Sequence, residues 1–227
     1  MKKRLAKEGL VTFIGGVSGA FLRFFSEVIV ARTLSVTEFG IYGLLMNIVA
    51  VVVHILSSGP RAVVQRFGAI LYHTNNQRSC RKLFVRALLF LSVLGPLSAA
   101  GMILSARQLA TLLGNPDIAE YIVYAALATP MMSTLYLLAD LFRAIGAVKY
   151  FNVIQEVIPA SLYVVAVLSI YFWVGISLTT ILMAYLASLL ATLLIGARWY
   201  WMVTRGWVEA KESVPEFPDF LNHAIFS

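Results

Sequence analysis

Six long apolar stretches constrain this chain more than any other feature of its sequence. Each has about the 20 residues that an α-helix needs to cross the hydrocarbon core of a bilayer. Polar segments separate the stretches, and none shows the short alternating pattern typical of a β-barrel strand. The sequence therefore predicts an all-α integral membrane protein, a bundle of six transmembrane helices. These run near Gly9–Ala31, Phe39–Ser58, Leu83–Leu104, Ile118–Leu141, Val153–Trp173 and Leu178–Ala197.

The composition excludes the other broad classes of protein. Of the 227 residues, 60% are hydrophobic and only 13% are charged, whereas about 25% of the residues in a soluble domain are charged. Disorder is excluded as well, because disordered chains have low hydrophobicity. The single cysteine, Cys80, excludes an intrachain disulfide and a cysteine-based metal cluster.

The Lys and Arg residues predict an orientation in the membrane. If the N-terminus is cytoplasmic, fifteen of the 18 Lys and Arg residues fall on inner segments, and only Arg32 and Arg107 fall on outer ones. Positive charge concentrates on the cytoplasmic side of membrane proteins. We therefore expect a multi-pass protein of the cytoplasmic (inner) membrane with both termini in the cytoplasm. The same bias accounts for the net charge of +7 without a nucleic-acid partner.

The first stretch has two different faces when it is drawn as a helix of 3.6 residues per turn. One face is small, polar and charged, and carries Thr12, Gly16, Gly19, Arg23, Ser26 and Glu27. The opposite face is apolar, and carries Leu10, Ile14, Val17, Phe21, Phe25 and Val28. The spacing of Gly15 and Gly19 is one that allows a neighbouring helix to approach closely.

The charges on this face point to an interior position. An arginine deep in a span costs at least about 2.5–3.5 kcal/mol on insertion scales, so we expect Arg23 and Glu27 to face the bundle interior or a cavity. Two interpretations are open at this stage. Arg23 and Glu27, four residues apart, neutralise each other, or they face a ligand in a water-filled cavity.

Other polar residues give weaker signals. Asp140 and Arg143 are expected to form an ion pair at the inner interface, and Glu156 either reaches that interface or joins the central cavity. The stretch Pro60–His73 is amphipathic and predicts a helix that continues the second span along the inner interface. There, Arg66 is a candidate for gathering an anionic lipid headgroup.

No catalytic set accompanies these residues. His54 and Ser58 are four apart, but no third orienting acid or Gly-x-Ser-x-Gly turn goes with them. No phosphate-binding Gly-Lys loop or metal-ligand cluster is found either. We therefore expect a protein that is not an enzyme and needs no cofactor or metal.

A resemblance to a known family begins at the junction of the first two spans. Residues 31–43, Ala-Arg-Thr-Leu-Ser-Val-Thr-Glu-Phe-Gly-Ile-Tyr-Gly, resemble the signature of polysaccharide biosynthesis proteins, and so do the segments at residues 7–9 and 59–67. These proteins are lipid-linked oligosaccharide flippases of the multidrug/oligosaccharidyl-lipid/polysaccharide exporter superfamily. The resemblance implies two six-helix halves around a central cavity, and basic cavity residues that meet the diphosphate of undecaprenyl-diphosphate-linked sugars.

The length of the chain departs from that family pattern. We expect residues 1–204 to form one six-helix half, the N-terminal one, and residues 205–227 to be a cytoplasmic linker towards a missing second half. The expected partners are a lipid-linked oligosaccharide, the lipid bilayer, and a missing C-terminal half or a second subunit.

The expected function is translocation of an undecaprenyl-diphosphate-linked oligosaccharide for surface polysaccharide synthesis, with Arg23, Glu27 and Arg66 as substrate-binding residues. A cation-coupled multidrug exporter of the same superfamily is the first alternative, and it would use Glu27 or Asp140 as its ion site. A membrane fragment that does not transport, and an intramembrane enzyme, are the others.

Overall fold

The computed structural model describes residues 2–173 and 175–207, and within them every side chain except those of residues 2–12 and 14. The described residues form helices joined by short turns. In chain order the helices are α1 (Lys2–Thr33), α2 (Val36–His73), α3 (Gln77–Leu104), α4 (Ala106–Leu112), α5 (Ile118–Ala144), α6 (Val148–Asn152), the π-helical η1 (Val153–Val157), α7 (Ile158–Trp173) and α8 (Leu178–Thr204).

The predicted membrane spans all fall inside these helices. Five helical segments of the described residues are long and apolar enough to cross a membrane: α2, α3, α5, α8 and the continuous run Val148–Trp173. The first predicted span lies inside α1, which has 32 residues. The all-helical membrane bundle is confirmed with five such helices, and the membrane crossing of α1 stays a prediction.

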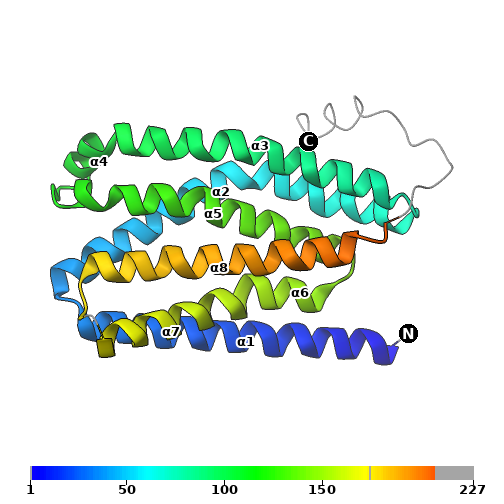
Figure 1. The fold of residues 1–227 in the computed structure, drawn as a ribbon, viewed down its shortest axis with the longest axis horizontal. Helices are drawn as coiled ribbons and strands as arrows, with labels where there is room; N and C mark the ends of the chain where they lie inside the picture. Colours follow the sequence, from blue (N-terminus) through cyan, green and yellow to red (C-terminus); the bar gives the residue numbers. More distant parts are fainter. Residues whose placement is uncertain (1, 174, 208–227) are drawn as a thin grey trace.

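The helices lie side by side in a bundle (Figure 1). α1 and α7 form one side of it, α2 and α3 the other, and α5 and α8 lie between them. The N-terminus, α6 and the end of α8 are at one end of the bundle, and α4 is at the other. The Lys- and Arg-bearing segments that we assign to the inner side therefore share one end of the bundle. Which side of the membrane that end faces stays a prediction.

The helix α2 is longer than a membrane span. Its 38 residues extend about 57 Å at 1.5 Å per residue. It begins with a capping box, in which the Glu38 backbone N–H donates to the Ser35 hydroxyl at 3.3 Å and the Ser35 N–H donates to the Glu38 carboxylate at 3.0 Å. The predicted helix at Pro60–His73 is the second half of α2, and it packs its buried face against α3 and α5.

α5 is the central helix of the described residues. It contributes to both apolar clusters of the core, one that contains Ile122 and Leu45 and one that contains Phe142 and Leu83. Its neighbours are α2, α3 and α8. Any polar side chain on the inner faces of α5 is therefore surrounded by protein.

The fifth predicted span contains a local change of helix type that the sequence did not indicate. Before Pro159 the chain forms the π-helix η1, in which the Ile158 N–H donates to the Val153 carbonyl, five residues back. Proline has no N–H, so Pro159 cannot donate to the Gln155 carbonyl as an α-helix would require. The missing hydrogen bond at Pro159 is accommodated by one wide turn ahead of it.

Candidate functional site

A cavity of about 90 Å³ lies between α1, α5, η1, α7 and α8. Its apolar walls include Leu135 and Leu189. Six residues with polar side chains share the lining: Arg23, Tyr136, Gln155, Glu156, Tyr163 and Tyr185. A mostly apolar cavity with a few convergent polar groups has the character of a small-ligand site, although ligand sites usually reach about 300 Å³ or more.

Arg23 and Glu156 form an ion pair across this cavity. The Arg23 Nη2 atom contacts the Glu156 Oε2 atom, and the two side chains are 54% and 22% exposed. Of the two positions expected for Glu156, the cavity is therefore the one observed. Of the two interpretations left open for Arg23 and Glu27, mutual neutralisation is not observed, because the carboxylate that Arg23 contacts belongs to η1.

The close approach of α1 and η1 depends on two glycines. A Cβ atom on Gly19 would lie 2.5 Å from the Glu156 Cβ, and one on Gly15 would lie 3.1 Å from the Asn152 Cβ. By contrast, a Cβ on Gly16 would have no atom within 4 Å. The Gly15 and Gly19 spacing therefore lets a neighbouring helix approach as predicted, and that neighbour is the junction of α6 and η1.

The hydrogen bonds of the cavity wall are incomplete within the described residues. The Tyr163 hydroxyl donates to the Tyr42 hydroxyl at 3.3 Å. Gln155 Oε1, in the cavity lining, has no hydrogen-bond partner in the described part of the chain. Buried polar groups without partners cost free energy unless water or a ligand satisfies them, so this wall is suited to a polar ligand or to water.

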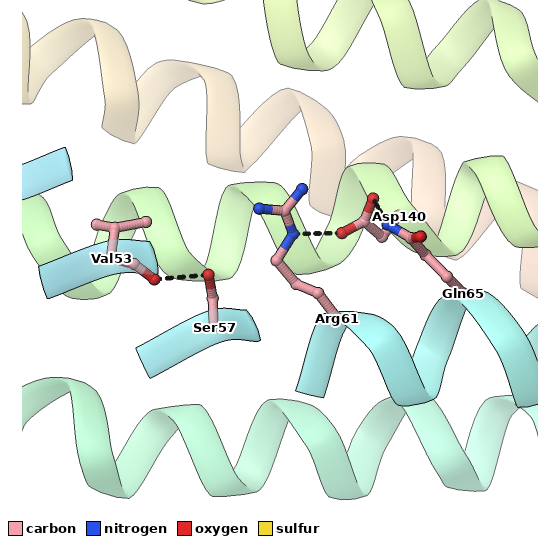
Figure 2. A network of polar contacts seen from close by, with 5 residues as sticks. All are labelled: Val53, Ser57, Arg61, Gln65 and Asp140. Atoms are coloured by element: carbon pink, nitrogen blue, oxygen red, sulfur yellow. Dashed lines mark hydrogen bonds and ion pairs between the residues drawn. The ribbon is translucent and has the colours of Figure 1, made fainter. Parts of the chain in front are cut away.

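A second arginine–carboxylate pair joins α2 to α5 (Figure 2). Arg61 Nε donates to Asp140 Oδ2 at 2.5 Å, and Gln65 Nε2 donates to Asp140 Oδ1 at 2.7 Å. Asp140 is fully buried. Arg61 also stacks over the Tyr136 ring, 4.9 Å from its centroid, and its terminal nitrogens point away from Asp140.

This arrangement corrects the expected ion pair of Asp140 with Arg143. Arg143 stacks on Phe151, 5.3 Å from the ring centroid, while Asp140 faces α2. The two residues are three apart on α5, and that spacing did not decide the pairing, because Asp140 is on the buried side of the helix and Arg143 is exposed.

The three predicted substrate-binding residues are not brought together. Arg23 lines the cavity. Glu27 is exposed on α1, and Arg66 is exposed on α2, where it stacks on Phe67 at 5.6 Å. Neither Glu27 nor Arg66 belongs to the cavity lining.

Sequence reasoning missed Arg61 and the polar wall of the cavity. A signal for Arg61 was present, because Gln65 follows it by four residues and the two side chains therefore share one face of α2. Polar side chains on one face of an apolar helix predict a buried partner, and Asp140 in an apolar run was the natural candidate. No comparable signal marked Gln155, since the π-helical turn sets where its side chain points.

The described residues contain no cluster of three or more His, Cys, Asp or Glu that could hold a metal ion. What the cavity offers is one guanidinium, a carboxylate beside it, and tyrosine and amide groups. A guanidinium in an apolar surrounding can bind a carboxylate or a phosphate through two parallel hydrogen bonds.

Comparisons with known proteins agree with one another on the fold. A family profile described as polysaccharide biosynthesis protein matches residues 5–223. No curated protein sequence matches significantly. Among solved structures, an outward-facing multidrug resistance MATE family transporter of the MOP superfamily is similar with a TM-score of 0.75, and a MOP superfamily transporter from Pyrococcus furiosus with a TM-score of 0.73. Each is 16% identical, and the match covers 99% of this chain but only 50% of the solved one. The chain thus spans about half the length of the structures it resembles.

Proposed function

This chain belongs to the polysaccharide biosynthesis protein family, and we propose that it takes part in moving an undecaprenyl-diphosphate-linked oligosaccharide across the cytoplasmic membrane. The fold of a transporter half and the multi-pass helical bundle support a transport function. The lipid-linked substrate is inferred from the family and from the chemistry of the cavity.

The observation that carries the proposal is the position of Arg23. The attraction between opposite charges is several-fold stronger in a low-dielectric interior than in bulk water. A diphosphate headgroup that crosses the membrane needs such a counter-charge, and Arg23 supplies one in a cavity with apolar walls. Arginine stays protonated at any physiological pH, so this counter-charge is always present.

The exposure of Arg23 supports a partner for this half. Its side chain is 54% exposed, and an arginine on a span cannot face lipid cheaply. We therefore infer that its open side faces an aqueous path completed by a second half, supplied by a C-terminal segment or by a second subunit. In this arrangement both halves would shift around a site near the middle of the membrane, as in other secondary transporters.

A cation-coupled multidrug exporter is the alternative, since some of the similar solved structures are multidrug transporters by name. The two acids considered as ion sites, Glu27 and Asp140, are poorly placed to bind a cation. Both carboxylate oxygens of Asp140 accept hydrogen bonds from Arg61 and Gln65, and Glu27 lies outside the cavity lining. This alternative predicts that a cationic drug, and not a diphosphate lipid, binds in the cavity lined by Arg23.

The test compares Arg23→Ala with Arg107→Ala, which removes an exposed arginine on α4. We expect Arg23→Ala to lower binding of undecaprenyl diphosphate by the chain in lipid nanodiscs about tenfold or more, which corresponds to about 1.4 kcal/mol. Arg107→Ala should bind like wild type, because water and salt screen an exposed charge.

The same two variants should differ in glycan export when each is joined to a second half and expressed in a strain that lacks its own flippase, with protein levels matched. Equal binding and equal export by wild type and Arg23→Ala would remove Arg23 from the mechanism. A chain that merely packs in the membrane without transporting would give no export with any variant.

A further inference from the structure

The ion pair of Arg23 with Glu156 has no role in the function proposed so far. Both residues line the cavity, and their charged atoms are in contact between α1 and η1. A carboxylate inside a site for anions would repel them, because bringing like charges together is unfavourable. If Arg23 binds a diphosphate, Glu156 cannot stay where the structure places it.

We propose that Glu156 is the resident counter-ion of Arg23 and sets the affinity of the site for anionic headgroups. It occupies the guanidinium while the site is empty, and an anionic diphosphate headgroup displaces it. This inference rests on the proposed function and names the residue that an arriving headgroup must displace.

The two anions compete for the same guanidinium. Its planar fork binds one oxyanion group bidentately, and Glu156 already contacts the Nη2 donor, so a phosphate that uses this donor displaces the carboxylate. A built-in competitor lowers the apparent affinity of every anion by the same factor. Only a headgroup with enough negative charge, such as a diphosphate, then binds well.

Access to Arg23 permits the exchange. Its side chain is 54% exposed, whereas that of Glu156 is 22% exposed. A headgroup therefore reaches the guanidinium from the open side before Glu156 leaves. The cavity of about 90 Å³ is too small for a sugar-bearing headgroup, so full entry requires α1 to separate from η1.

The backbone beneath Glu156 is suited to that separation. η1 lacks the α-helical hydrogen-bond pattern, and Pro159 on the following turn has no N–H to restore it. On the other side of the pair, Gly19 brings α1 within contact of Glu156. Loss of the ion pair therefore removes the charged contact that holds α1 to η1 where the two helices approach most closely.

The test measures binding of two lipids by the whole chain in nanodiscs, undecaprenyl diphosphate and undecaprenyl monophosphate. We expect Glu156→Gln to bind the diphosphate lipid about fivefold or more tighter than wild type, within the usual range of coupling between sites. The monophosphate lipid should gain by the same factor, because removal of a competitor raises every affinity alike. Glu120→Gln is the matched control, because it removes an exposed carboxylate in the first turn of α5 that lies outside the cavity lining, and it should leave both affinities unchanged.

Distances between two spin labels test the separation of α1 from η1 in the otherwise wild-type chain, independently of Glu156→Gln. The labels are placed at Val17 on α1 and Val165 on α7, both exposed, in a Cys80→Ala background. We expect the distance to lengthen when undecaprenyl diphosphate is added, and to be longer already in Glu156→Gln without it.

Unchanged distances, or a Glu156→Gln variant with wild-type affinity for both lipids, would overturn the inference. If Arg23→Ala still lost binding in that case, the proposed function would stand. If wild type and Arg23→Ala bound undecaprenyl diphosphate equally, both the proposed site and this inference would fall. Should Glu156→Gln fold poorly, the label distances in the otherwise wild-type chain decide.

Discussion

Two arginine–carboxylate pairs join helices of this protein, and their surroundings differ. Asp140 is fully buried and accepts from two donors, Arg61 and Gln65. Glu156 lines a cavity and contacts Arg23, whose side chain is about half exposed. The first pair links α2 to α5, whereas the second links α1 to η1.

The difference shows why the same chemistry serves two purposes. A buried carboxylate whose partner is lost remains uncompensated, at a cost of about 3–5 kcal/mol. A pair that opens on a cavity can exchange its partner for water or for a ligand, so it contributes little to stability. We therefore interpret Arg61 and Asp140 as a structural connection and Arg23 and Glu156 as an exchangeable one.

The largest effect is expected for Arg61→Ala. This change leaves Asp140 fully buried without its cationic partner, and we expect the free energy of unfolding to fall by about 3–5 kcal/mol. The measurement is unfolding in mixed micelles by titration with dodecyl sulfate. Arg66→Ala, on the exposed face of the same helix, is the control and should change this free energy by less than about 0.5 kcal/mol.

A double variant separates charge from packing. Asp140→Leu together with Arg61→Met replaces the pair by apolar side chains and should recover most of the lost stability, because such replacements are often neutral. A double variant as unstable as Arg61→Ala would show that the connection depends on more than the unpaired charge.

An intermediate effect is expected for Gly19→Ala. The added Cβ would lie 2.5 Å from the Glu156 Cβ, so α1 and η1 must move apart, at a cost of about 1–3 kcal/mol for overpacking. Gly16→Ala is the matched control, since its Cβ would meet no atom within 4 Å. The free energies of unfolding of both variants are compared with wild type. Equal destabilisation by the two changes would contradict the assigned contact between α1 and η1.

The smallest effect on stability is expected for Glu156→Gln. Its partner is half exposed, and ion pairs of this kind contribute about 1 kcal/mol or less. The free energy of unfolding should therefore stay within about 1 kcal/mol of wild type, even though we expect ligand binding to change. A loss as large as that of Arg61→Ala would make the second pair structural too, and would remove the contrast between the two.

The helices and their order could be predicted from the sequence because each depends on local information. A run of about 20 apolar residues has few stable alternatives in a bilayer, where every backbone group must find its partner within the helix. The family was also identified from a local feature, the signature at residues 31–43, and the match over residues 5–223 confirms it. On the first helix, Val17, Phe21 and Phe25 of the apolar face are exposed, and so are Arg23 and Glu27 of the charged face, so the direction of the two faces stays a prediction.

The pairing of charges could not be predicted in the same way, because it depends on which helices become neighbours. Spacing along one helix suggested Arg23 with Glu27 and Asp140 with Arg143, and the packed bundle joins Arg23 to Glu156 and Asp140 to Arg61. The two observed partners are separated in sequence by 133 and 79 residues, so no local pattern connects them.

The sequence by itself determined that this chain is a helical membrane bundle with a charged face on its first helix. Only the tertiary structure decided which charges meet, and the reason is physical. Side chains three or four residues apart on a helix are neighbours at its surface. In a bundle, however, the contacts between helices decide more strongly which opposite charge a side chain meets. The wide turn before Pro159 and the close approach of Gly19 set the direction and distance of Glu156. The proline and the glycine are visible in the sequence, but only the packed structure shows that η1 is the neighbour of α1.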